Sequence, residues 1–562
     1  MRVHKMFKKK YLAIVFFALL ISAPAVSIQT SANNDEKQRA HVVILGTTDM
    51  HGRVFPIDYY TNKYDNVGIA KVATLIKEAR QNDPNLVLVD SGDTIQGTPL
   101  EYFHNKRNNT PPDPMMLAMS ALHYDAMAVG NHEYNFGLNV LEKARREAKF
   151  PWLSANTYDT QVKGGPSNHY TPFIIKEIDG VRIGVLGLTT PGIPNWENGP
   201  NYAGLEFRET VSEAKKWVGV LRDTGKVDLV VIAMHMGVEE DWRTGLPFPS
   251  QVPNENAAVA IARQVPGVDV ILMGHTHRDV PSLIVNGVLL AQANRWASHL
   301  ARVDVYLEKD ETDGRWRVIA KASRTIPVTE KTAIDPEIAK LGEPYDKETQ
   351  DWLGRVIGES SAELTAPDCR FKDSAIIDLI QRVQLEAGKA DVSMAACFNP
   401  AARIPKGPVT VRNIASLYEY ENTLVTVELT GQQLKDALEI SAKYFREYQP
   451  GKSLADQVDQ RVPGYNFDMA QGVSYELDLT RPFGQRVQNL TFKGQPLSPT
   501  QKLRVVTNNY RVNGGGGFTM YKSAPVVYRS SEEVRELIID WVERNKKIPV
   551  AADNNWRIVG AQ

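Results

Sequence analysis

Cysteine is almost absent from this sequence, with only Cys369 and Cys397 among 562 residues. A thiolate metal site needs more cysteines at closer spacing, so metal ligands must be sought among other residue types. The two cysteines are expected to be structural, either paired or simply buried. Export to an oxidising compartment would permit a disulfide, but the sequence alone does not show whether the two residues lie close together.

Net charge of either sign is also lacking, because the formal charge is −1 and the pI is near 6.9. No global electrostatic field therefore recruits a nucleic acid polymer or an anionic membrane surface, and an anionic ligand must be held locally. Beyond the N-terminus the sequence has no apolar run long enough to span a bilayer. We expect a monomer that binds no nucleic acid polymer and, once its leader is cleaved, no membrane.

The N-terminus has the pattern of a secretory signal peptide over residues 1–25. Arg2, Lys5 and lysines 8–10 precede an apolar stretch over 11–23, and Ala23-Pro24-Ala25 fits a cleavage site between small residues. The alternative is an N-terminal membrane anchor, but the apolar stretch is short for a bilayer span. No cysteine follows it, which argues against a lipid-modified N-terminus. The protein is predicted to be exported, to a periplasm or to the medium.

A chain of this length is too long for one hydrophobic core, so two or more domains are expected. Over residues 41–330, strand-like apolar runs alternate with helix-like stretches at 68–79, 138–148 and 210–221, which predicts a layered α/β domain. A charged amphipathic segment at 331–356 is predicted to be a linker helix. Residues 357–562 are predicted to form a second mixed α/β domain, with helices at 374–387 and 431–448 and a strand at 423–429.

Five apolar runs in the first domain each end in residues that can bind a metal. The runs cover 42–45, 86–89, 126–129, 229–233 and 270–273, and the residues after them include Asp49 and His51, Asp93, Asn131 and His132, His235, and His275 and His277. One such histidine could be an ordinary core residue, but chance does not place all five groups after apolar runs. In sheets rich in parallel strands, ligands gather at the carboxyl ends of strands. Aspartate, asparagine and histidine together suit Zn²⁺, Mn²⁺, Co²⁺ or Fe²⁺, and one carboxylate can bridge two such ions about 3.5–4 Å apart for phosphoester hydrolysis.

This ordered set resembles the calcineurin-like metallophosphoesterases. The resemblance extends through the second domain to the 5′-nucleotidase and cyclic-nucleotide phosphodiesterase family and covers essentially the whole mature chain. It implies a four-layer α/β/β/α first domain, a 5′-nucleotidase-type substrate domain and two divalent metal ions. The implied ligands are Asp49, His51 and His277 for metal 1, and Asn131, His235 and His275 for metal 2, with Asp93 bridging the two.

In such a site the cations would polarise the phosphoryl oxygens and lower the pKa of a bound water. Metal-bound hydroxide would then attack the phosphorus, so no nucleophilic side chain is needed. His132 matches the family's catalytic histidine, which stabilises transition-state charge or protonates the leaving alkoxide; alternatively it is only a neighbour of Asn131. Related 5′-nucleotidases place an aspartate where this chain has Asn135, which can orient an imidazole but cannot stabilise its charge. The cyclic-phosphodiesterase branch also has asparagine there. Glu133 is expected to support the ligands rather than bind a metal.

The resemblance also indicates a base-binding region in the second domain. Its expected members are Tyr420, Asn422, Tyr510, Gly514, Gly515 and Arg403. Aromatic rings would stack on the base, and the glycine run at 514–517 indicates close approach of the backbone to a ligand. A packing role for the tyrosines and a surface salt bridge for Arg403 are the alternatives. Gly516 stands where related 5′-nucleotidases have an aspartate, so contacts with the ribose are expected to differ.

The sequence therefore predicts a nucleotide as the substrate, bridging the two domains with the linker helix as a hinge. The primary hypothesis is an exported two-metal phosphoesterase that hydrolyses 2′,3′-cyclic nucleotides to 3′-nucleotides, and then 3′-nucleotides to nucleoside and phosphate. The runner-up is a 5′-nucleotidase or UDP-sugar hydrolase on the same scaffold. A third alternative is a nucleotide-binding protein that has lost catalysis, but such a protein would be expected to lack some of the metal-binding residues. A fourth is hydrolysis of a sulfur ester, against which the paired tyrosines argue.

Overall fold

The computed structural model describes residues 37–560 apart from 242, 249–251 and 421. The predicted signal peptide at 1–25 lies outside the described residues. Within the described residues, no helix is both long enough and apolar enough to cross a membrane.

Two six-stranded sheets form the centre of the first domain. The first sheet has the order β17 (Trp316–Pro327), β16 (His299–Lys309), β1 (Arg39–Thr47), β4 (Val87–Asp90), β5 (Ala126–Ala128) and β6 (Trp152–Leu153). The second has the order β14 (Asp279–Val285), β15 (Val288–Ala293), β13 (Val270–Met273), β12 (Leu229–His235), β10 (Val181–Thr189) and β9 (Phe173–Ile178). Strands β1, β4, β5 and β6 are parallel, as are β10, β12, β13 and β15. Parallel strands bring their carboxyl ends to one edge of each sheet.

Alternating side chains along the strands build four layers. In β1, Ile44 packs between the two sheets against residues such as Val185 and Val231, whereas Val43 and Leu45 face the helices on the outer side. The helices α1 (Ile69–Asn82), α2 (Pro99–Lys106), α3 (Pro114–Ala121) and α4 (Leu138–Glu147) belong to the first sheet's side, and α5 (Thr210–Gly219) and α6 (Ala258–Gln264) to the second. Strands buried on both faces are apolar almost throughout, as parallel sheets covered by helices require. The predicted α/β/β/α layering is confirmed.

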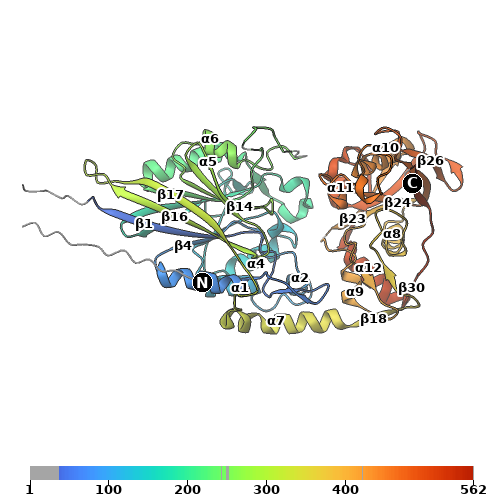
Figure 1. The fold of residues 1–562 in the computed structure, drawn as a ribbon, viewed down its shortest axis with the longest axis horizontal. Helices are drawn as coiled ribbons and strands as arrows, with labels where there is room; N and C mark the ends of the chain where they lie inside the picture. Colours follow the sequence, from blue (N-terminus) through green and yellow to red (C-terminus); the bar gives the residue numbers. More distant parts are fainter. Residues whose placement is uncertain (1–36, 242, 249–251, 421, 561–562) are drawn as a thin grey trace, which may run out of the picture.

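Helix α7 (Pro336–Gly354) occupies the segment predicted as a linker and runs along one edge of both domains (Figure 1). Its first turn is capped by Asp335, whose carboxylate accepts from the backbone N–H groups of Glu337 and Ile338 at 3.1 Å. The helix packs on α1, α2 and α3 of the first domain and on α9 (Val411–Ala415) of the second. Its contacts with three helices bind it to the first domain.

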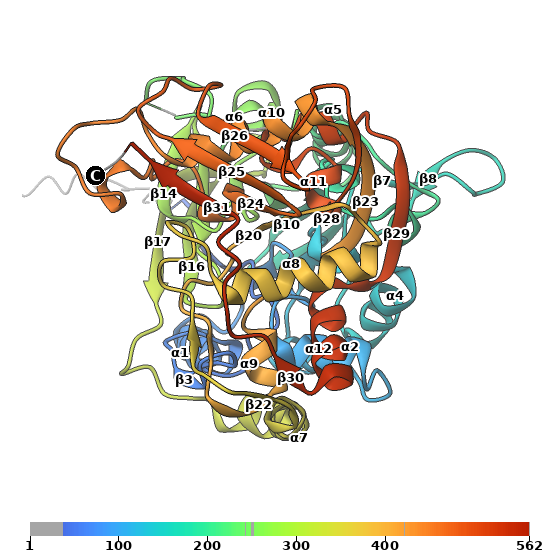
Figure 2. The ribbon, with the colours of Figure 1, turned by 90° about the vertical axis from the view of Figure 1, so that its right-hand side faces the viewer.

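The second domain is mixed α and β, as predicted. A five-stranded sheet has the order β24 (Asp468–Gln471), β20 (Val392–Ala396), β28 (Lys502–Asn508), β23 (Thr423–Thr430) and β29 (Val526–Glu533). A four-stranded sheet has the order β27 (Gln495–Pro496), β26 (Val487–Phe492), β25 (Val473–Asp478) and β31 (Trp556–Val559), and a small one contains β22 (Gly407–Thr410), β18 (Val356–Ser360) and β30 (Lys547–Ile548). The remaining helices are α8 (Ala375–Gly388), α10 (Gly431–Ser441), α11 (Asn509–Val512) and α12 (Val534–Asn545). Figure 2 shows α8 lying across the middle of this domain with α12 below it.

The helices predicted at 68–79, 138–148 and 374–387 are confirmed as α1, α4 and α8, and the strand at 423–429 as β23. The helix predicted at 210–221 is α5, which continues as a π-turn over Val220–Thr224. The prediction of a single helix over 431–448 is wrong, because α10 ends at Ser441 and only a 3₁₀ turn follows, to Tyr444. The buried guanidinium of Arg486 donates to the carbonyls of Ala442 and Phe445 at 2.9 and 2.7 Å. It thereby satisfies the carbonyl of the C-cap residue Ala442, a contact from 44 residues away that periodicity cannot reveal.

The two cysteines are paired. Cys369 and Cys397 form a disulfide with their Cα atoms 6.1 Å apart, and both residues are buried. The sequence left open whether the two cysteines are paired or simply buried, and the structure shows that they are paired.

Candidate metal centre and adjoining pocket

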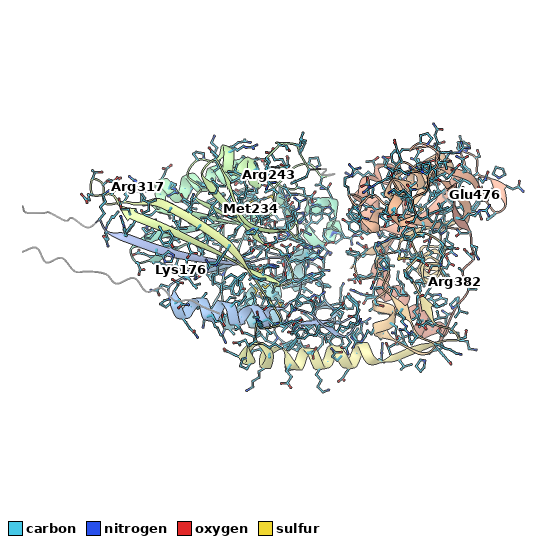
Figure 3. All side chains as sticks on the ribbon, viewed as in Figure 1. Lys176, Met234, Arg243, Arg317, Arg382 and Glu476 are labelled. Atoms are coloured by element: carbon cyan, nitrogen blue, oxygen red, sulfur yellow. A yellow bond between two sulfur atoms is a disulfide. The ribbon has the colours of Figure 1, made fainter. Side chains whose placement is uncertain are left out.

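All seven predicted metal ligands lie at the carboxyl ends of parallel strands. Asp49 and His51 follow β1, Asp93 follows β4, Asn131 follows β5, His235 ends β12, and His275 and His277 follow β13. Met234, labelled in Figure 3, precedes His235 on β12 and lies inside the first domain. The two sheets therefore contribute their ligand-bearing ends to one site.

The structure brings these side chains together in two groups. Asp49, His51 and His277 form one group, and Asp93, His235 and His275 form the other, with the potential ligand atoms of each group within 4.8 Å of one another. Asp93 Oδ2 lies 3.0 Å from His235 Nε2 and 3.9 Å from His51 Nε2, so this carboxylate stands between the groups as a bridging ligand must.

Asn131 lies on the side of the second group. Its Oδ1 is 3.1 Å from His235 Nε2, which is where the resemblance places it. In the first group, His277 Nε2 lies 3.3 Å from Asp49 Oδ1 and 3.0 Å from His51 Nε2. The two clusters have the composition that divalent cations with mixed nitrogen and oxygen preference require.

Hydrogen bonds outside the clusters fix which histidine nitrogen faces the metal position. The Nδ1–H of His51 donates to the carbonyl of Gln96 at 2.9 Å, and that of His235 donates to the carbonyl of Ser91 at 2.7 Å. Each bond occupies Nδ1 and directs Nε2 towards the candidate metal position, the usual arrangement of metal-binding histidines. These residues therefore fit a pair of divalent ions.

Glu133 holds the loops that carry the ligands. Its buried carboxylate accepts from the backbone N–H groups of Asp93, Thr94 and Gly130 at 3.0, 2.6 and 2.7 Å. Both oxygens are thus occupied by the backbone, and Glu133 ties the loop after β4 to the loop after β5.

Burial governs the electrostatics of the site, because Asp49, Asp93 and His235 are almost inaccessible to solvent. Burial and the neighbouring His277 lower the pKa of His51 to about 3, so its imidazole is neutral, as a ligand must be. Burial alone would lower the pKa of His235 as well, but the Asp93 carboxylate beside it raises that pKa to about 10. A cation at this position would take the place of the proton that His235 and Asp93 hold.

Backbone strain is concentrated at the ligands. Five of the seven have a left-handed φ between 49° and 70°, namely Asp49, His51, Asp93, His275 and His277. Residues other than glycine rarely adopt this conformation, which costs on the order of 1–3 kcal/mol each and persists where the surrounding structure enforces it. Strain gathered at one place is typical of a functional site.

His132 lies beside the clusters, with its ring 5.2 Å from the ring of His51. Its backbone N–H donates to Asp93 Oδ1 at 2.8 Å, and its Nδ1 bonds Asn135 Oδ1 at 2.6 Å. Asn135 in turn donates from Nδ2 to Glu197 Oε2 at 2.7 Å. Sequence reasoning found His132 and Asn135 but missed Glu197, which lies in a loop 62 residues away and belongs to no recognisable motif.

A pocket of about 610 Å³ adjoins the metal centre and has walls from both domains. Its lining includes Trp196, Glu255, Tyr465, Tyr510, Gly514 and Gly515. The ring of Trp196 lies 5.3 Å from the ring of His275, and Glu255 Oε1 lies 2.9 Å from His275 Nε2. The pocket therefore reaches a metal ligand on one side and the predicted residues Tyr510, Gly514 and Gly515 on the other.

Sequence reasoning missed Tyr465 because it lies in a single 3₁₀ turn over Gly464–Asn466, which is too short to give a periodic pattern. Tyr420 is not part of the pocket wall, although its ring centroid lies 6.3 Å from that of Tyr465. Asn422 Oδ1 accepts from the hydroxyl of Tyr418 at 3.3 Å. For Tyr420 and Asn422 a role in base binding stays a prediction.

The remaining predicted contact, Arg403 in the short strand β21 (Arg403–Ile404), lies apart from the pocket lining. Its side chain is 65% exposed and pairs with Glu363. This arrangement agrees with the alternative of a surface salt bridge, and a contact with phosphate or ribose stays a prediction.

A third group of carboxylates lies in the second domain and comprises Asp373, Asp378 and Asp553. The backbone N–H of Asp553 donates to Asp378 Oδ2 at 3.0 Å, and that of Asn555 donates to Asp373 Oδ2 at 3.3 Å. These acceptors fasten the segment before β31 to the start of α8.

Comparison with known proteins identifies the family. Residues 42–279 match the family model for the calcineurin-like phosphoesterases, and residues 356–523 match that for the 5′-nucleotidase C-terminal domain. A 2′,3′-cyclic-nucleotide 2′-phosphodiesterase/3′-nucleotidase of Haemophilus influenzae is 31% identical over 608 aligned positions, which cover 95% of this chain and 90% of that protein. This chain belongs to the 5′-nucleotidase family with a calcineurin-like phosphoesterase domain. It is therefore a metallophosphoesterase that uses divalent metal ions.

Other relatives of the family differ in extent. The trifunctional nucleotide phosphoesterase protein YfkN of Bacillus subtilis is 30% identical over 97% of this chain, but the chain spans only 40% of that protein's length. A crystal structure of a Staphylococcus aureus protein in complex with α-ketoglutarate matches with a TM-score of 0.81 at 27% identity, covering 92% of this chain and 100% of that one. That of a 5′-nucleotidase precursor from Thermus thermophilus matches with a TM-score of 0.64 at 25% identity, covering 93% and 100%.

Proposed function

We propose that this protein is an exported phosphoesterase that hydrolyses 2′,3′-cyclic nucleotides to 3′-nucleotides, and then 3′-nucleotides to nucleoside and phosphate. The observation that carries the proposal is the pocket lined by Tyr465 and Tyr510 of one domain and by Trp196 of the other, whose ring lies 5.3 Å from the ring of the predicted metal ligand His275. Such a pocket offers stacking surfaces for a base at one end and cations for a phosphate at the other.

When bound, the two cations supply phosphoryl polarisation and an activated water. The chain's own residues then have distinct roles. His132 bonds Asn135 through Nδ1, which directs Nε2 away from Asn135, and Nε2 is the nitrogen that serves the leaving oxygen in this proposal. Tyr465 and Tyr510 hold the base, and the backbone of Gly514 and Gly515 lets the substrate approach closely.

The cyclic phosphodiester is preferred as substrate because Asn135 stands where related 5′-nucleotidases have an aspartate, and because a 31% identical relative carries the corresponding name. Export is supported by the signal-like N-terminus and by the Cys369–Cys397 disulfide, a bond that is common in oxidising compartments and rare in the cytosol. The protein is proposed to act as a monomer on free nucleotides, without nucleic acid polymer or membrane.

A second candidate is hydrolysis of 5′-nucleotides or UDP-sugars, which the match to the Thermus thermophilus 5′-nucleotidase precursor favours. The test is a substrate panel on metal-reconstituted protein containing 2′,3′-cyclic AMP, 3′,5′-cyclic AMP, 3′-AMP, 5′-AMP and UDP-glucose. Turnover of 2′,3′-cyclic AMP and 3′-AMP is expected to dominate. Dominant turnover of 5′-AMP would replace the proposal by the second candidate.

The same metal-reconstituted preparation also tests the alternative that the protein binds nucleotides without catalysis. Hydrolysis of a generic phosphodiester is expected to vanish on chelation and to fall at least about 100-fold in Asp93→Asn, because the shared carboxylate is lost to both cations. Activity that survives both changes would remove the two-metal basis of the proposal.

A further inference from the structure

Asn135 lies between His132 and a carboxylate that the sequence did not reveal. Its Oδ1 is 2.6 Å from His132 Nδ1, and its Nδ2 is 2.7 Å from Glu197 Oε2. Related enzymes place an aspartate directly beside the histidine. Here the amide of Asn135 takes that position, and the carboxylate of Glu197 contacts the amide instead of the histidine.

The chemistry of an amide makes this chain of bonds directional. Nδ2 of asparagine only donates and Oδ1 only accepts, whereas an ionised carboxylate only accepts. Facing Glu197, the amide must therefore present Nδ2 to the carboxylate and Oδ1 to the imidazole. An acceptor beside His132 Nδ1 requires a proton on Nδ1, and this in turn fixes the ring with Nε2 directed away from Asn135.

Glu197 is itself held in place and is 6% exposed. Its Oε1 accepts from the backbone N–H of Asn198 at 2.6 Å and from Asn201 Nδ2 at 2.9 Å. Three N–H donors therefore satisfy the carboxylate, as a buried charge requires. With every partner a donor, Glu197 cannot turn away from Asn135 without losing hydrogen bonds.

The loop that carries Glu197 is also anchored to the second domain. Asn198 Nδ2 donates to Thr423 Oγ1 at 3.1 Å, and Asn509 Nδ2 donates to the carbonyl of Trp196 at 3.2 Å. Asn509 adjoins the pocket residue Tyr510. The position of Glu197 is thus set from both sides of the pocket.

We propose that Glu197 is a positioning residue for His132, acting through Asn135 by fixing the direction of its amide. The proposal rests on the proposed function, in which His132 serves the leaving group. In that step the water oxygen forms the new bond to phosphorus and the bond to the leaving oxygen breaks with its electron pair. Before this step His132 carries a proton on each ring nitrogen; the Nε2 proton passes to the leaving oxygen, the Nδ1 proton stays in the bond to Asn135, and the proton lost by the water goes to solvent.

The first test is Glu197→Gln, assayed at pH 8.5 because burial raises the pKa of Glu197 to about 7 and the carboxyl must be ionised. The introduced amide keeps one acceptor oxygen, which the two N–H donors of Asn198 and Asn201 hold on their side, so its NH₂ group faces Asn135 Nδ2. We expect the amide of Asn135 to turn over in response and present Nδ2 to His132. Synthetic phosphodiesters with leaving alcohols of increasing pKa report the consequence, since a good leaving group needs no proton. We expect kcat to fall about 10-fold or more for a poor leaving group and less than about threefold for 4-nitrophenol, with KM nearly unchanged.

The matched control is Glu439→Gln in α10. Glu439 is also 6% exposed, and its carboxylate accepts from the backbone N–H groups of Arg486 and Val487 at 3.0 and 2.8 Å, with no connection to the metal centre. It should leave kcat unchanged for every leaving group. A loss in Glu197→Gln that is equal for all leaving groups would overturn the proposal, because it would mark a general structural effect.

The second test repeats the change in an Asn135→Asp background. There the introduced carboxylate presents an acceptor to His132 whichever side chain stands at position 197, so the loss caused by Glu197→Gln is expected to disappear. If Glu197→Gln lowers kcat by the same factor in this background, the proposal that Glu197 acts through Asn135 is contradicted. Because the substrates are synthetic, these outcomes do not depend on which nucleotide is the natural one, and failure of the proposed function would show instead as a wild-type protein without phosphoester hydrolysis.

Discussion

Gly130 offers a sharp test of how tightly the bridging carboxylate is held. A Cβ atom at this position would lie 2.2 Å from Asp93 Oδ1, 2.5 Å from Asp93 N and 2.7 Å from Glu133 Oε2. Its φ is not among the positive values, so the backbone accepts alanine and the effect of Gly130→Ala is steric alone. An ordinary contact begins near 3.4 Å, so the Asp93 oxygen must retreat by roughly 1.2 Å, whereas metal–ligand distances tolerate only about 0.2 Å.

We therefore expect Gly130→Ala to lower kcat/KM on a generic phosphodiester at least about 100-fold, the effect of misplacing a reacting group by about 1 Å. Elemental analysis after reconstitution should show fewer than two metal ions per chain. Overpacking costs on the order of 1–3 kcal/mol, so the variant should still fold.

The control is Gly219→Ala at the end of α5, where a Cβ meets nothing within 4 Å. It should retain activity and gain on the order of 0.5 kcal/mol in stability, because alanine is the better helix former. Full metal content together with activity within about threefold of wild type in Gly130→Ala would refute the reasoning that the bridging position is rigid.

Two further predictions concern the second domain. Replacing Cys369 and Cys397 by alanine should cost about 3–4 kcal/mol, seen as a lower urea midpoint, because the bond closes a loop of 28 residues; an unchanged midpoint would argue against that cost. Burial, Asp373 and Asp553 raise the pKa of Asp378 to about 7. The folded state therefore binds more protons than the unfolded state between about pH 4 and pH 7, so the free energy of unfolding decreases as pH rises through this window. Asp553→Asn should therefore melt close to wild type at pH 4 and be more stable by about 1 kcal/mol at pH 8, and calorimetry showing a less stable variant at pH 8 would contradict this repulsion.

The sequence predicted that the candidate metal ligands lie close together, because each of them follows an apolar run and strand ends meet at one edge of a sheet. Asp49 and His277 are 228 positions apart in the printed sequence, yet the alternation of strands and helices was enough to place them in one site. The same alternation predicted a layered α/β domain, since strands buried on both faces are continuously apolar, whereas the four-layer arrangement was implied by the family resemblance.

Features that depend on side-chain contacts between distant loops could not be predicted. Glu197 lies in a loop and Tyr465 in a single 3₁₀ turn, and neither segment has periodicity, so their contacts with distant residues could not be inferred from the sequence. The C-cap carbonyl of α10 is satisfied by Arg486 from another element. The left-handed backbone of Asp49 and His51 likewise follows from the packing of the loops and leaves no mark in residue type.

The division of the pocket between the two domains has a consequence for how such enzymes diversify. His275 and the other predicted metal ligands come wholly from the first domain, whereas the pocket residues Tyr465 and Tyr510 come from the second. Under the proposed function, mutations in the second domain would alter which organic group is accepted without changing the residues that hold the cations. The same metal centre can thus be retained during evolution while the substrate specificity of the enzyme changes.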